Sequence, residues 1–316
     1  MPESAAPESA TPGHEPLADE VPDLAAAEPV DAPAPGQKPS PPYRTAFVLG
    51  GGGQLGACEV GMLRALVEAG IRPDLVLGAS VGAINGAVIA ADPTIASVDR
   101  LEKLWVGLGA SGVFDDSLLT RLGTAVRTRT HLHANTGLRR RLEADLPVQL
   151  IEELAIPFQC VAASIERAAE HWFAEGPIAD AVLASCAVPG LLPPVAVDGE
   201  HYLDGGLVNS VPVGRAIALG AQTVYVLHVG RIEQPLRVPE RPWEVAAVAF
   251  EIARRHRFTR DIADLPPGVD LHILPTGAAP AGSGNWTQYM RYRDFTRIHE
   301  RIGAAHRATG AYLAGR

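Results

Sequence analysis

Residues 74–87 read DLVLGASVGAINGA, an apolar run that breaks at a Gly-x-Ser-x-Gly sequence and resumes with small residues suited to a helix. This pattern predicts a strand, a sharp turn and a helix. Ser80 would then lie at the apex of the turn, where a Cβ at Gly78 or Gly82 would crowd the backbone. We interpret Ser80 as a candidate nucleophile, although a tight Gly-Ser turn in any α/β protein has the same appearance.

A second strand, loop and helix lie immediately before this stretch. Residues 44–49 predict a buried strand, residues 50–56 read GGGGQLG, and apolar residues at helical spacing predict a helix over 57–69. Two consecutive βα units with apolar, non-alternating strands favour a parallel sheet covered on both faces. Beyond them we expect strands or extended segments at 158–163, 171–174, 199–204, 223–229 and 271–274, and helices at 98–108, 116–126, 137–146, 178–186, 243–262 and 289–313.

The first 42 residues differ in composition from the rest of the chain. They contain eleven prolines and eight acidic side chains against one lysine, so they carry −7 of the formal net charge of −9. Such a segment cannot bury enough apolar surface to offset chain entropy, and we expect a disordered tail at 1–42 and one folded domain at 43–316. The remaining charge of −2 gives no support for nucleic-acid binding, which needs a basic face.

The cysteines and the hydropathy pattern exclude further classes of protein. Three cysteines lie far apart without a Cys-x-x-Cys spacing, so neither a disulfide framework nor a zinc site is expected. The N-terminus has no basic segment followed by an apolar one, and the most apolar window, residues 75–91, is interrupted by polar residues and glycines. We therefore expect a cytoplasmic protein with at most peripheral membrane contact. The sequence gives no indication of the oligomeric state.

The glycine loop at 50–56 has two interpretations. Its spacing Gly51-x-Gly53-x-x-Gly56 satisfies the dinucleotide-binding fingerprint, and an acidic residue, Asp74, follows at about the expected distance. However, the acid that binds a ribose should follow the second strand, whereas Asp74 precedes it and Ser80 occupies that place. Nucleotide binding is therefore the weaker interpretation.

The stronger interpretation is an oxyanion hole. Glycines expose successive backbone N–H groups, and a helix N-terminus adds partial positive charge. Because parallel βα units place both loops at the carboxyl edge of the sheet, the amides of Gly51, Gly52 and Gly53 can point at the carbonyl that Ser80 attacks.

The base must come from another part of the chain, and two arrangements are open. In one, Asp204 orients a histidine as in an α/β-hydrolase triad, with three candidates: His228, His256 and His272. In the other, Asp204 is itself the base of a Ser–Asp dyad, which requires an oriented and partly desolvated carboxylate. Asp204 lies between a short strand and the pair Gly205-Gly206, so we expect its side chain to be well exposed to a site.

Four motifs together resemble the patatin-like phospholipase family: the glycine loop 50–56, the Gly-x-Ser-x-Gly at 78–82, the proline-flanked run 189–194, and Asp204-Gly205-Gly206 with Asn209 and Pro212 after it. The resemblance covers about residues 44–230. It implies a three-layer α/β/α fold with a mostly parallel central sheet and a lipid acyl hydrolase at 43–316, without a metal or cofactor, that cleaves a lipid or acyl-ester substrate through an acyl-serine.

The resemblance also implies a role for each matching residue. Ser80 would be the nucleophile, Asp204 the general base, and the amides of Gly51 to Gly53 the oxyanion hole. The remaining motif glycines, which support the loop and the two turns, are Gly56, Gly78, Gly82, Gly205 and Gly206.

One residue departs from the family pattern. Glycine loops of the family usually carry Arg or Lys just before the final glycine, whereas this chain has Leu55 there, beside Gln54. Backbone amides can still form an oxyanion hole, but an anionic phospholipid would lose a cation that assists its recognition. A neutral lipid, a lysolipid and an acyl thioester are therefore also candidate substrates, and a catalytically weak or inactive lipid-binding or regulatory protein is the alternative function.

Overall fold

The computed structural model describes residues 43–110, 136–229, 235–236, 238–277 and 297–316. All of them belong to the larger of two structural units, residues 33–316. The tail expected at 1–42, the helix expected at 116–126 and the start of the helix expected at 289–313 lie outside the described residues.

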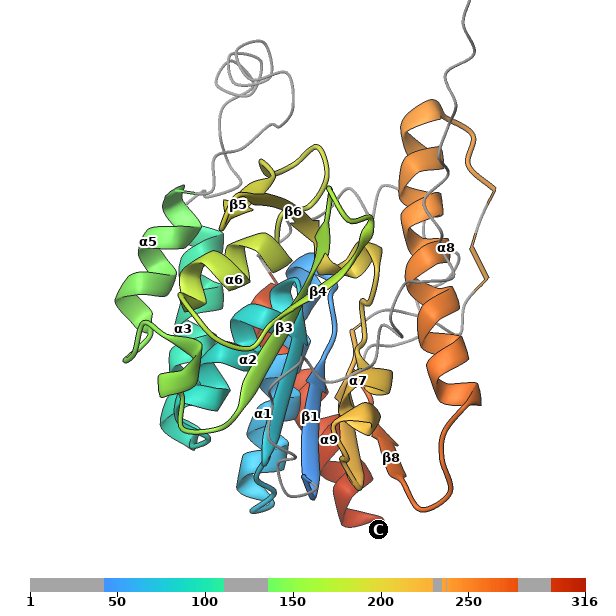
Figure 1. Ribbon diagram of the computed structural model, residues 1–316. Helices are drawn as coiled ribbons and strands as arrows, with labels where there is room; N and C mark the ends of the chain where they lie inside the picture. The colour runs from blue at the N-terminus through green and yellow to red at the C-terminus, as the bar shows by residue number, and fades with distance from the viewer. Residues whose placement is uncertain (1–42, 111–135, 230–234, 237, 278–296) are drawn as a thin grey trace, which may run out of the picture. The chain divides into compact units, whose positions relative to one another are not determined.

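The described residues form one eight-stranded sheet in the order β5-β6-β3-β2-β1-β7-β8, with β4 paired to β3 (Figure 1). Strands β3, β2, β1, β7 and β8 are parallel to one another, and β4, β5 and β6 run antiparallel to their neighbours. The prediction of a mostly parallel sheet is therefore confirmed. The strands are β1 Thr45–Leu49, β2 Leu75–Ala79, β3 Phe158–Ser164, β4 Ala169–Phe173, β5 Val195–Val197, β6 Glu200–Asp204, β7 Thr223–Leu227 and β8 Asp270–Ile273.

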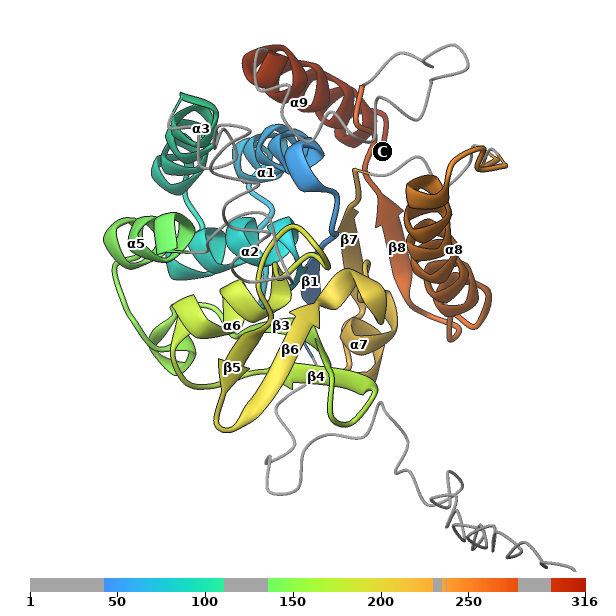
Figure 2. The ribbon, with the colours of Figure 1, turned by 90° about the horizontal axis from the view of Figure 1, so that it is seen from above.

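Helices cover both faces of this sheet, as Figure 2 shows from above, with α1, α3 and α9 on one side and α7 and α8 on the other. The helices are α1 Ala57–Glu68, α2 Val81–Ala91, α3 Ile95–Ala110, α5 Thr136–Asp145, α6 Ile178–Ser185, α7 Val213–Ala218, α8 Pro242–Ala263 and α9 Ile298–Ala314, with short 3-10 helices at Gly53–Gly56, Ile151–Glu153 and Gly205–Leu207. Among these described helices, none is both long and apolar enough to cross a membrane.

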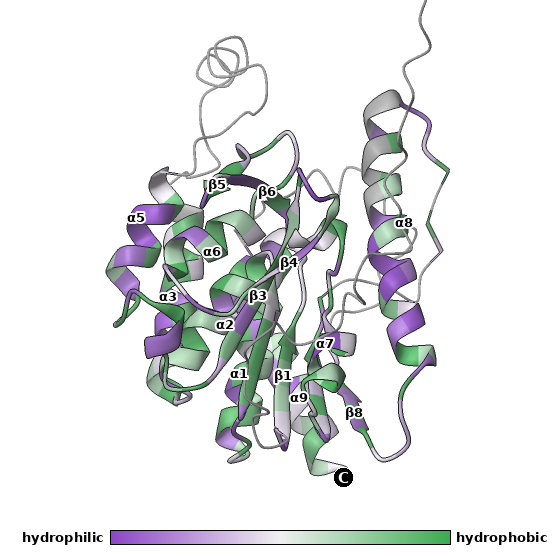
Figure 3. Ribbon diagram, viewed as in Figure 1, coloured by the Kyte–Doolittle hydropathy of each residue, from purple (hydrophilic) through white to green (hydrophobic). Residues whose placement is uncertain are grey.

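The continuous apolar character of β1 and β2 follows from burial on both faces. In β1, Phe47 and Leu49 point into a core shared with α1, α2, α6 and α9. The alternate residues Ala46 and Val48 point into a second core with α7 and with Phe258 of α8. A strand whose two faces both meet helices has no solvent-facing position, so its sequence does not alternate between apolar and polar. Figure 3 shows the same pattern in the hydropathy of the central strands and of α2.

The structure also contains two short elements that the sequence did not predict, β5 and α7. β5 has three residues and pairs only with β6, and α7 has six residues and begins directly after Pro212. Three strand residues or six helical residues are too few for a hydrophobic periodicity to be recognised in the sequence. Tertiary contacts therefore define these two elements.

Helices α1 and α9 pack closely against each other. Gly61 lies in the middle of α1, and a Cβ added there would lie 2.1 Å from the carbonyl oxygen of Ile302 in α9. Only glycine allows the two backbones to approach this closely.

We predict that Gly61→Ala lowers the free energy of unfolding by about 1–3 kcal/mol, because the added methyl forces the two helices apart. The measurement is urea denaturation followed by circular dichroism. Gly310→Ala in α9 is the matched control, because a Cβ there meets nothing within 4 Å. It should instead stabilise the protein by about 0.5–1 kcal/mol through helix propensity. Equal effects of the two substitutions would contradict the close contact.

Candidate active site

Ser80 lies at the sharp turn between β2 and α2, with φ of 54° and ψ of −126°. This left-handed φ is unfavourable for a residue with a side chain and costs on the order of 1–3 kcal/mol. The flanking glycines allow the turn: a Cβ at Gly82 would lie 2.3 Å from the carbonyl oxygen of Leu49, and one at Gly78 would lie 2.6 Å from that of Gly82. The expectation that side chains at these two positions would crowd the turn is therefore confirmed.

Strand β3 places Asp204 next to this turn. Val161 of β3 pairs with Ala79 of β2 and with β4, and the next residue, Ala162, pairs with Asp204 of β6 and with β4. Because β4 occupies one edge of β3 along both residues, β2 and β6 share the other edge. The two strands run towards each other and meet end to end. Ser80, which follows the last residue of β2, therefore faces Asp204, the last residue of β6.

The two side chains are hydrogen-bonded. Ser80 Oγ donates to Asp204 Oδ2 at 2.6 Å, and the Gly206 amide donates to Asp204 Oδ1 at 2.7 Å. Gly205 must lack a side chain because a Cβ there would lie 2.1 Å from the carbonyl oxygen of Val161. A hydroxyl bonded to an oriented carboxylate is the arrangement that activates a serine as a nucleophile.

The expectation that Asp204 is well exposed is wrong. Its exposed fraction is 1%, and that of Ser80 is 6%. Burial raises the pKa of Asp204 from 3.8 to about 6, while the hydrogen bonds from Ser80 and Gly206 and the charge of Arg254 lower it. The carboxyl is buried because β6 enters the sheet at the end of β2 and is covered by the end of α6, which a local strand–glycine pattern does not reveal.

The end of α6 fixes the backbone of both residues. Ser185 Oγ accepts a hydrogen bond from the Ser80 N–H at 2.9 Å, and the carbonyl oxygen of Ala187 accepts one from the Asp204 N–H at 2.9 Å. One helix terminus thus sets the distance between the two groups. The sequence contained no signal for this role of Ser185, which depends on a contact across 105 positions.

The glycine loop lies against Ser80, but its amides are not equivalent. A Cβ at Gly51 would be 3.3 Å from the Cβ of Ser80. However, the Gly51 N–H already donates to the carbonyl oxygen of Ser210 at 2.9 Å. The Gly52 and Gly53 amides have no acceptor among the described residues. Of the three expected oxyanion donors, these two are therefore the available ones.

A buried polar network holds the far end of the loop. Asn85 Nδ2 donates to the carbonyl oxygen of Gly56 at 3.0 Å and to Glu59 Oε2 at 2.8 Å, and Trp105 Nε1 donates to Asn85 Oδ1 at 2.9 Å. Gly56 packs against the ring of Trp105: a Cβ added at Gly56 would lie 2.7 Å from Cζ2 of Trp105. Burial raises the pKa of Glu59 well above its usual range. The sequence does not reveal this network, because Asn85, Glu59 and Trp105 come from three separate helices.

Asp74, the acidic residue that the dinucleotide-binding interpretation requires, lies far from the glycine loop's end of the sheet. Asp74 is at the amino edge of the sheet, where its carboxylate accepts hydrogen bonds from the backbone N–H groups of Arg44 and Thr45 at 3.2 and 3.0 Å. Its contacts fix the start of β1, and Ser80 is at the opposite edge.

The three histidines of the triad interpretation have other neighbours. His256 is exposed on α8. His272 contacts Asp270 and Tyr312 through its two ring nitrogens at 2.9 and 3.3 Å. The buried His228 packs its ring against Phe258. The structure thus brings Asp204 to Ser80 directly, without an intervening imidazole.

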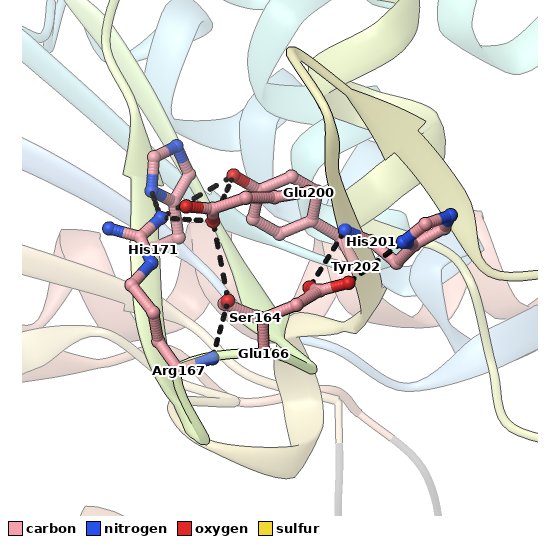
Figure 4. A network of polar contacts seen from close by, with 7 residues as sticks. All are labelled: Ser164, Glu166, Arg167, His171, Glu200, His201 and Tyr202. Atoms are coloured by element: carbon pink, nitrogen blue, oxygen red, sulfur yellow. Dashed lines mark hydrogen bonds and ion pairs between the residues drawn. The ribbon is translucent and has the colours of Figure 1, made fainter.

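A polar network on the outer side of β6 holds this strand against β3 and β4 (Figure 4). Arg167 contacts Glu200 at 2.6 Å, and the Tyr202 hydroxyl donates to Glu200 Oε2 at 3.0 Å. The Tyr202 ring, two residues before Asp204, packs between His171 and Phe173 of β4. These contacts fix the register of the strand that ends at Asp204.

The fold and the site together define an α/β protein with a serine–carboxylate pair at a strained strand–helix turn. Comparison with known proteins identifies the family: the sequence model of the patatin-like phospholipases matches residues 47–217. The chain therefore belongs to the patatin-like phospholipase family, and the resemblance drawn from its motifs is confirmed.

Several relatives match the same region. Patatin-like phospholipase domain-containing protein 7 of Mus musculus is 31% identical over 187 residues, which cover 58% of this chain and 13% of that protein. Patatin-like phospholipase domain-containing protein ZK370.4 of Caenorhabditis elegans is 36% identical over 191 residues, 60% of this chain and 14% of that protein. Lysophospholipase nte1 of Aspergillus terreus is 32% identical over 188 residues, 59% of this chain and 12% of that protein.

The match therefore spans only a small part of each of these longer relatives. Among solved structures, VipD from Legionella pneumophila aligns with a TM-score of 0.40 and 15% identity over 87% of this chain and 67% of that one.

We predict that Asp204→Asn stabilises the protein above pH 6 by up to about 3 kcal/mol, because a pKa raised from 3.8 to about 6 makes the ionised carboxylate costly to bury. The native state binds more protons than the unfolded state between these values, so wild-type stability falls as pH rises from about 4 to about 6. The difference should shrink as pH falls towards 4 and vanish well below the unfolded-state pKa of 3.8, where the carboxyl is neutral in both states.

Urea denaturation of both proteins between pH 4 and pH 8 measures this effect. Asp145→Asn, which changes an exposed carboxylate, controls for the loss of one charge. A stability difference between wild type and Asp204→Asn that is independent of pH would contradict the raised pKa.

Proposed function

We propose that the chain is a serine-dependent lipid acyl hydrolase, with residues 43–316 as its hydrolase domain. The observation that carries the proposal is the 2.6 Å hydrogen bond from Ser80 Oγ to the buried carboxylate of Asp204 at the turn after β2. Membership of the patatin-like phospholipase family supports the same reaction class.

In the first half of the reaction, Asp204 takes the Ser80 hydroxyl proton as Oγ attacks the carbonyl carbon of the acyl ester. The carbonyl oxygen becomes an oxyanion, which accepts hydrogen bonds from the Gly52 and Gly53 amides at the N-terminal end of the 3-10 helix and α1. The intermediate collapses as the ester C–O bond breaks, and the leaving alcohol takes the proton from Asp204. Ser80 is left acylated.

In the second half, Asp204 takes a proton from a water molecule, which attacks the acyl-serine. A second oxyanion forms in the same place. Its collapse breaks the bond to Ser80 Oγ, which regains the proton from Asp204, and the carboxylic acid leaves. Each cycle consumes one ester and one water molecule and returns Ser80 and Asp204 to their starting protonation states.

The burial of Asp204 is what makes it an adequate base. A carboxylate with a pKa near 4 is weak at neutral pH, whereas a pKa of about 6 lies nearer to the working pH and is still low enough for the group to be ionised at pH 7. The Gly206 amide fixes one oxygen and leaves the other facing Ser80.

The substrate class is a lipid or other acyl ester. The names of the relatives include phospholipase and lysophospholipase, and we extend only the cleavage of a lipid acyl ester to this chain. Because Leu55 occupies the place of a loop cation, lysolipids, neutral lipids and acyl thioesters belong in the same test as anionic phospholipids. The Leu55 substitution also favours the alternative function, a catalytically weak or inactive lipid-binding protein on the same fold.

We predict that Ser80→Ala and Asp204→Asn each reduce hydrolysis of a medium-chain nitrophenyl ester on the order of 10³-fold or more, because the two groups act as one unit. Intact-mass analysis after fluorophosphonate treatment should show one adduct in the wild type and none in Ser80→Ala. Ser97→Ala, a buried serine of α3, should behave as the wild type. An unlabelled wild-type protein that still binds lipid vesicles would support the alternative function.

We also predict that kcat/KM rises with pH through about 6, because Asp204 must be ionised to accept the Ser80 proton. The profile should be measured between pH 4.5 and pH 9 with the same ester, with circular dichroism at each pH to confirm folding. An acidic limb centred near pH 4 would contradict a raised pKa of Asp204 in the free enzyme.

A further inference from the structure

Arg254 of α8 reaches the glycine loop from a distant part of the chain. Its Nη1 donates to the carbonyl oxygen of Gly51 at 2.6 Å and lies 3.4 Å from Ser210 Oγ. The exposed fraction of its side chain is 6%. Arg254 lies beyond residues 47–217, the segment that matches the family.

The contact to Gly51 has a direct consequence for Gly52. The Gly51 carbonyl and the Gly52 N–H belong to the same planar trans peptide group, in which the two bonds point in opposite directions. A guanidinium bound to the carbonyl oxygen on one side therefore turns the N–H to the other side. It also withdraws electron density from the peptide, which makes the N–H a better donor to an anion.

The loop itself supplies no positive charge, and its contacts around Gly51 are made by other segments. Residues 50–56 contain no basic side chain. The Gly51 N–H is held by the Ser210 carbonyl, so the Gly51 residue is bound at both its N–H and its C=O. Gly52 itself has no Cβ to restrict its rotation, and its φ of 176° is ordinary extended backbone.

We propose that Arg254 is a positioning residue of the oxyanion hole: it aims the Gly52 N–H at the developing oxyanion and supplies the positive charge that the glycine loop lacks. This inference rests on the proposed hydrolase function of the same site.

Helix α8 is anchored firmly enough to hold this side chain in place. Phe258, four residues further along, packs in the core beneath β7. Arg257 contacts Glu170 of β4 at 3.4 Å and Asp261 at 3.0 Å. The inner face of α8 is therefore bound to the sheet one turn after Arg254.

Arg254 also acts on the base through its charge. The titratable groups that interact with Asp204 are Arg254 of α8 and Cys186 after α6. Glu251 of α8 pairs with Arg254, and His228 after β7 lies beside Gly50. Arg254 is the charge among them that lowers the pKa of Asp204. Its removal should raise that pKa, so the activity should need a higher pH.

The test compares Arg254→Gln, Arg254→Lys and Arg260→Gln in the full chain. Arg260 is exposed on the same helix, so its substitution controls for the loss of one charge from α8. The measurements are kcat and KM for the nitrophenyl ester between pH 4.5 and pH 9, and the fraction of Ser80 that a fluorophosphonate labels, which counts functional sites.

Arg254→Gln should lower kcat per labelled site on the order of 10- to 100-fold, somewhat less than removal of an oxyanion donor, with little change in KM. Its acidic limb should move to higher pH. Arg254→Lys keeps the charge but not the forked geometry, so its loss in kcat should be smaller and its acidic limb should stay in place. Arg260→Gln should match the wild type.

An Arg254→Gln protein with wild-type kcat per labelled site and an unmoved acidic limb would overturn this inference but leave the proposed hydrolase function standing. If that variant does not fold, Arg254→Lys decides: a several-fold lower kcat per labelled site supports the inference, and an unchanged one overturns it. A wild-type protein that is not labelled at Ser80 overturns the proposed function, and this inference with it.

Discussion

The arrangement of the site depends on one edge of β3. Two consecutive residues of that strand, Val161 and Ala162, hold the end of β2 and the end of β6 against each other. A parallel strand that arrives from one direction and an antiparallel strand that arrives from the other leave their last residues face to face. The 2.6 Å contact between Ser80 and Asp204 is therefore a property of the sheet register and not of flexible loops. Hydrogen bonds from the end of α6 and the network around Tyr202 hold the same register from two sides.

This close approach is possible only at a cost in stability. Ser80 has a left-handed φ, three glycines are needed where backbones touch, and a carboxyl is buried with its pKa raised. Each of these features is unfavourable by itself, on the order of 1–3 kcal/mol. The two extensive cores on either face of β1 and β2 supply the opposing free energy. The surrounding packing therefore holds these unfavourable features in place.

Much of the fold was predictable from the sequence because its central strands and first two helices have strong local patterns. The runs at 45–49 and 75–79 are apolar throughout, and glycines mark the turns after them. The residues alone left a triad with a histidine and a Ser–Asp dyad open, and the resemblance to the patatin-like phospholipases implied the pairing of Ser80 with Asp204. It remains a prediction that these residues catalyse hydrolysis.

The features that the sequence did not reveal depend on contacts between distant segments. Burial of Asp204, capture of the Gly51 N–H by Ser210, and the roles of Ser185 and Arg254 join residues more than 100 positions apart. No spacing rule relates such residues, because the tertiary fold alone brings them together. The short elements β5 and α7 were missed for a related reason, since their neighbours define them.

Several contacts that complete the sheet and the site in this chain come from outside the family segment. Residues 47–217 contain Ser80, Asp204 and the glycine loop, but not β7, which pairs with β1 in the centre of the sheet, nor α9, which packs on α1. They also lack Arg254, which donates a hydrogen bond to the Gly51 carbonyl. Ser210, which lies within the family segment, accepts the hydrogen bond from the Gly51 N–H. Arg254, which lies beyond that segment, donates to the Gly51 C=O. Since the Gly51 residue is held from both directions, the geometry of the proposed oxyanion hole depends on residues beyond the family segment.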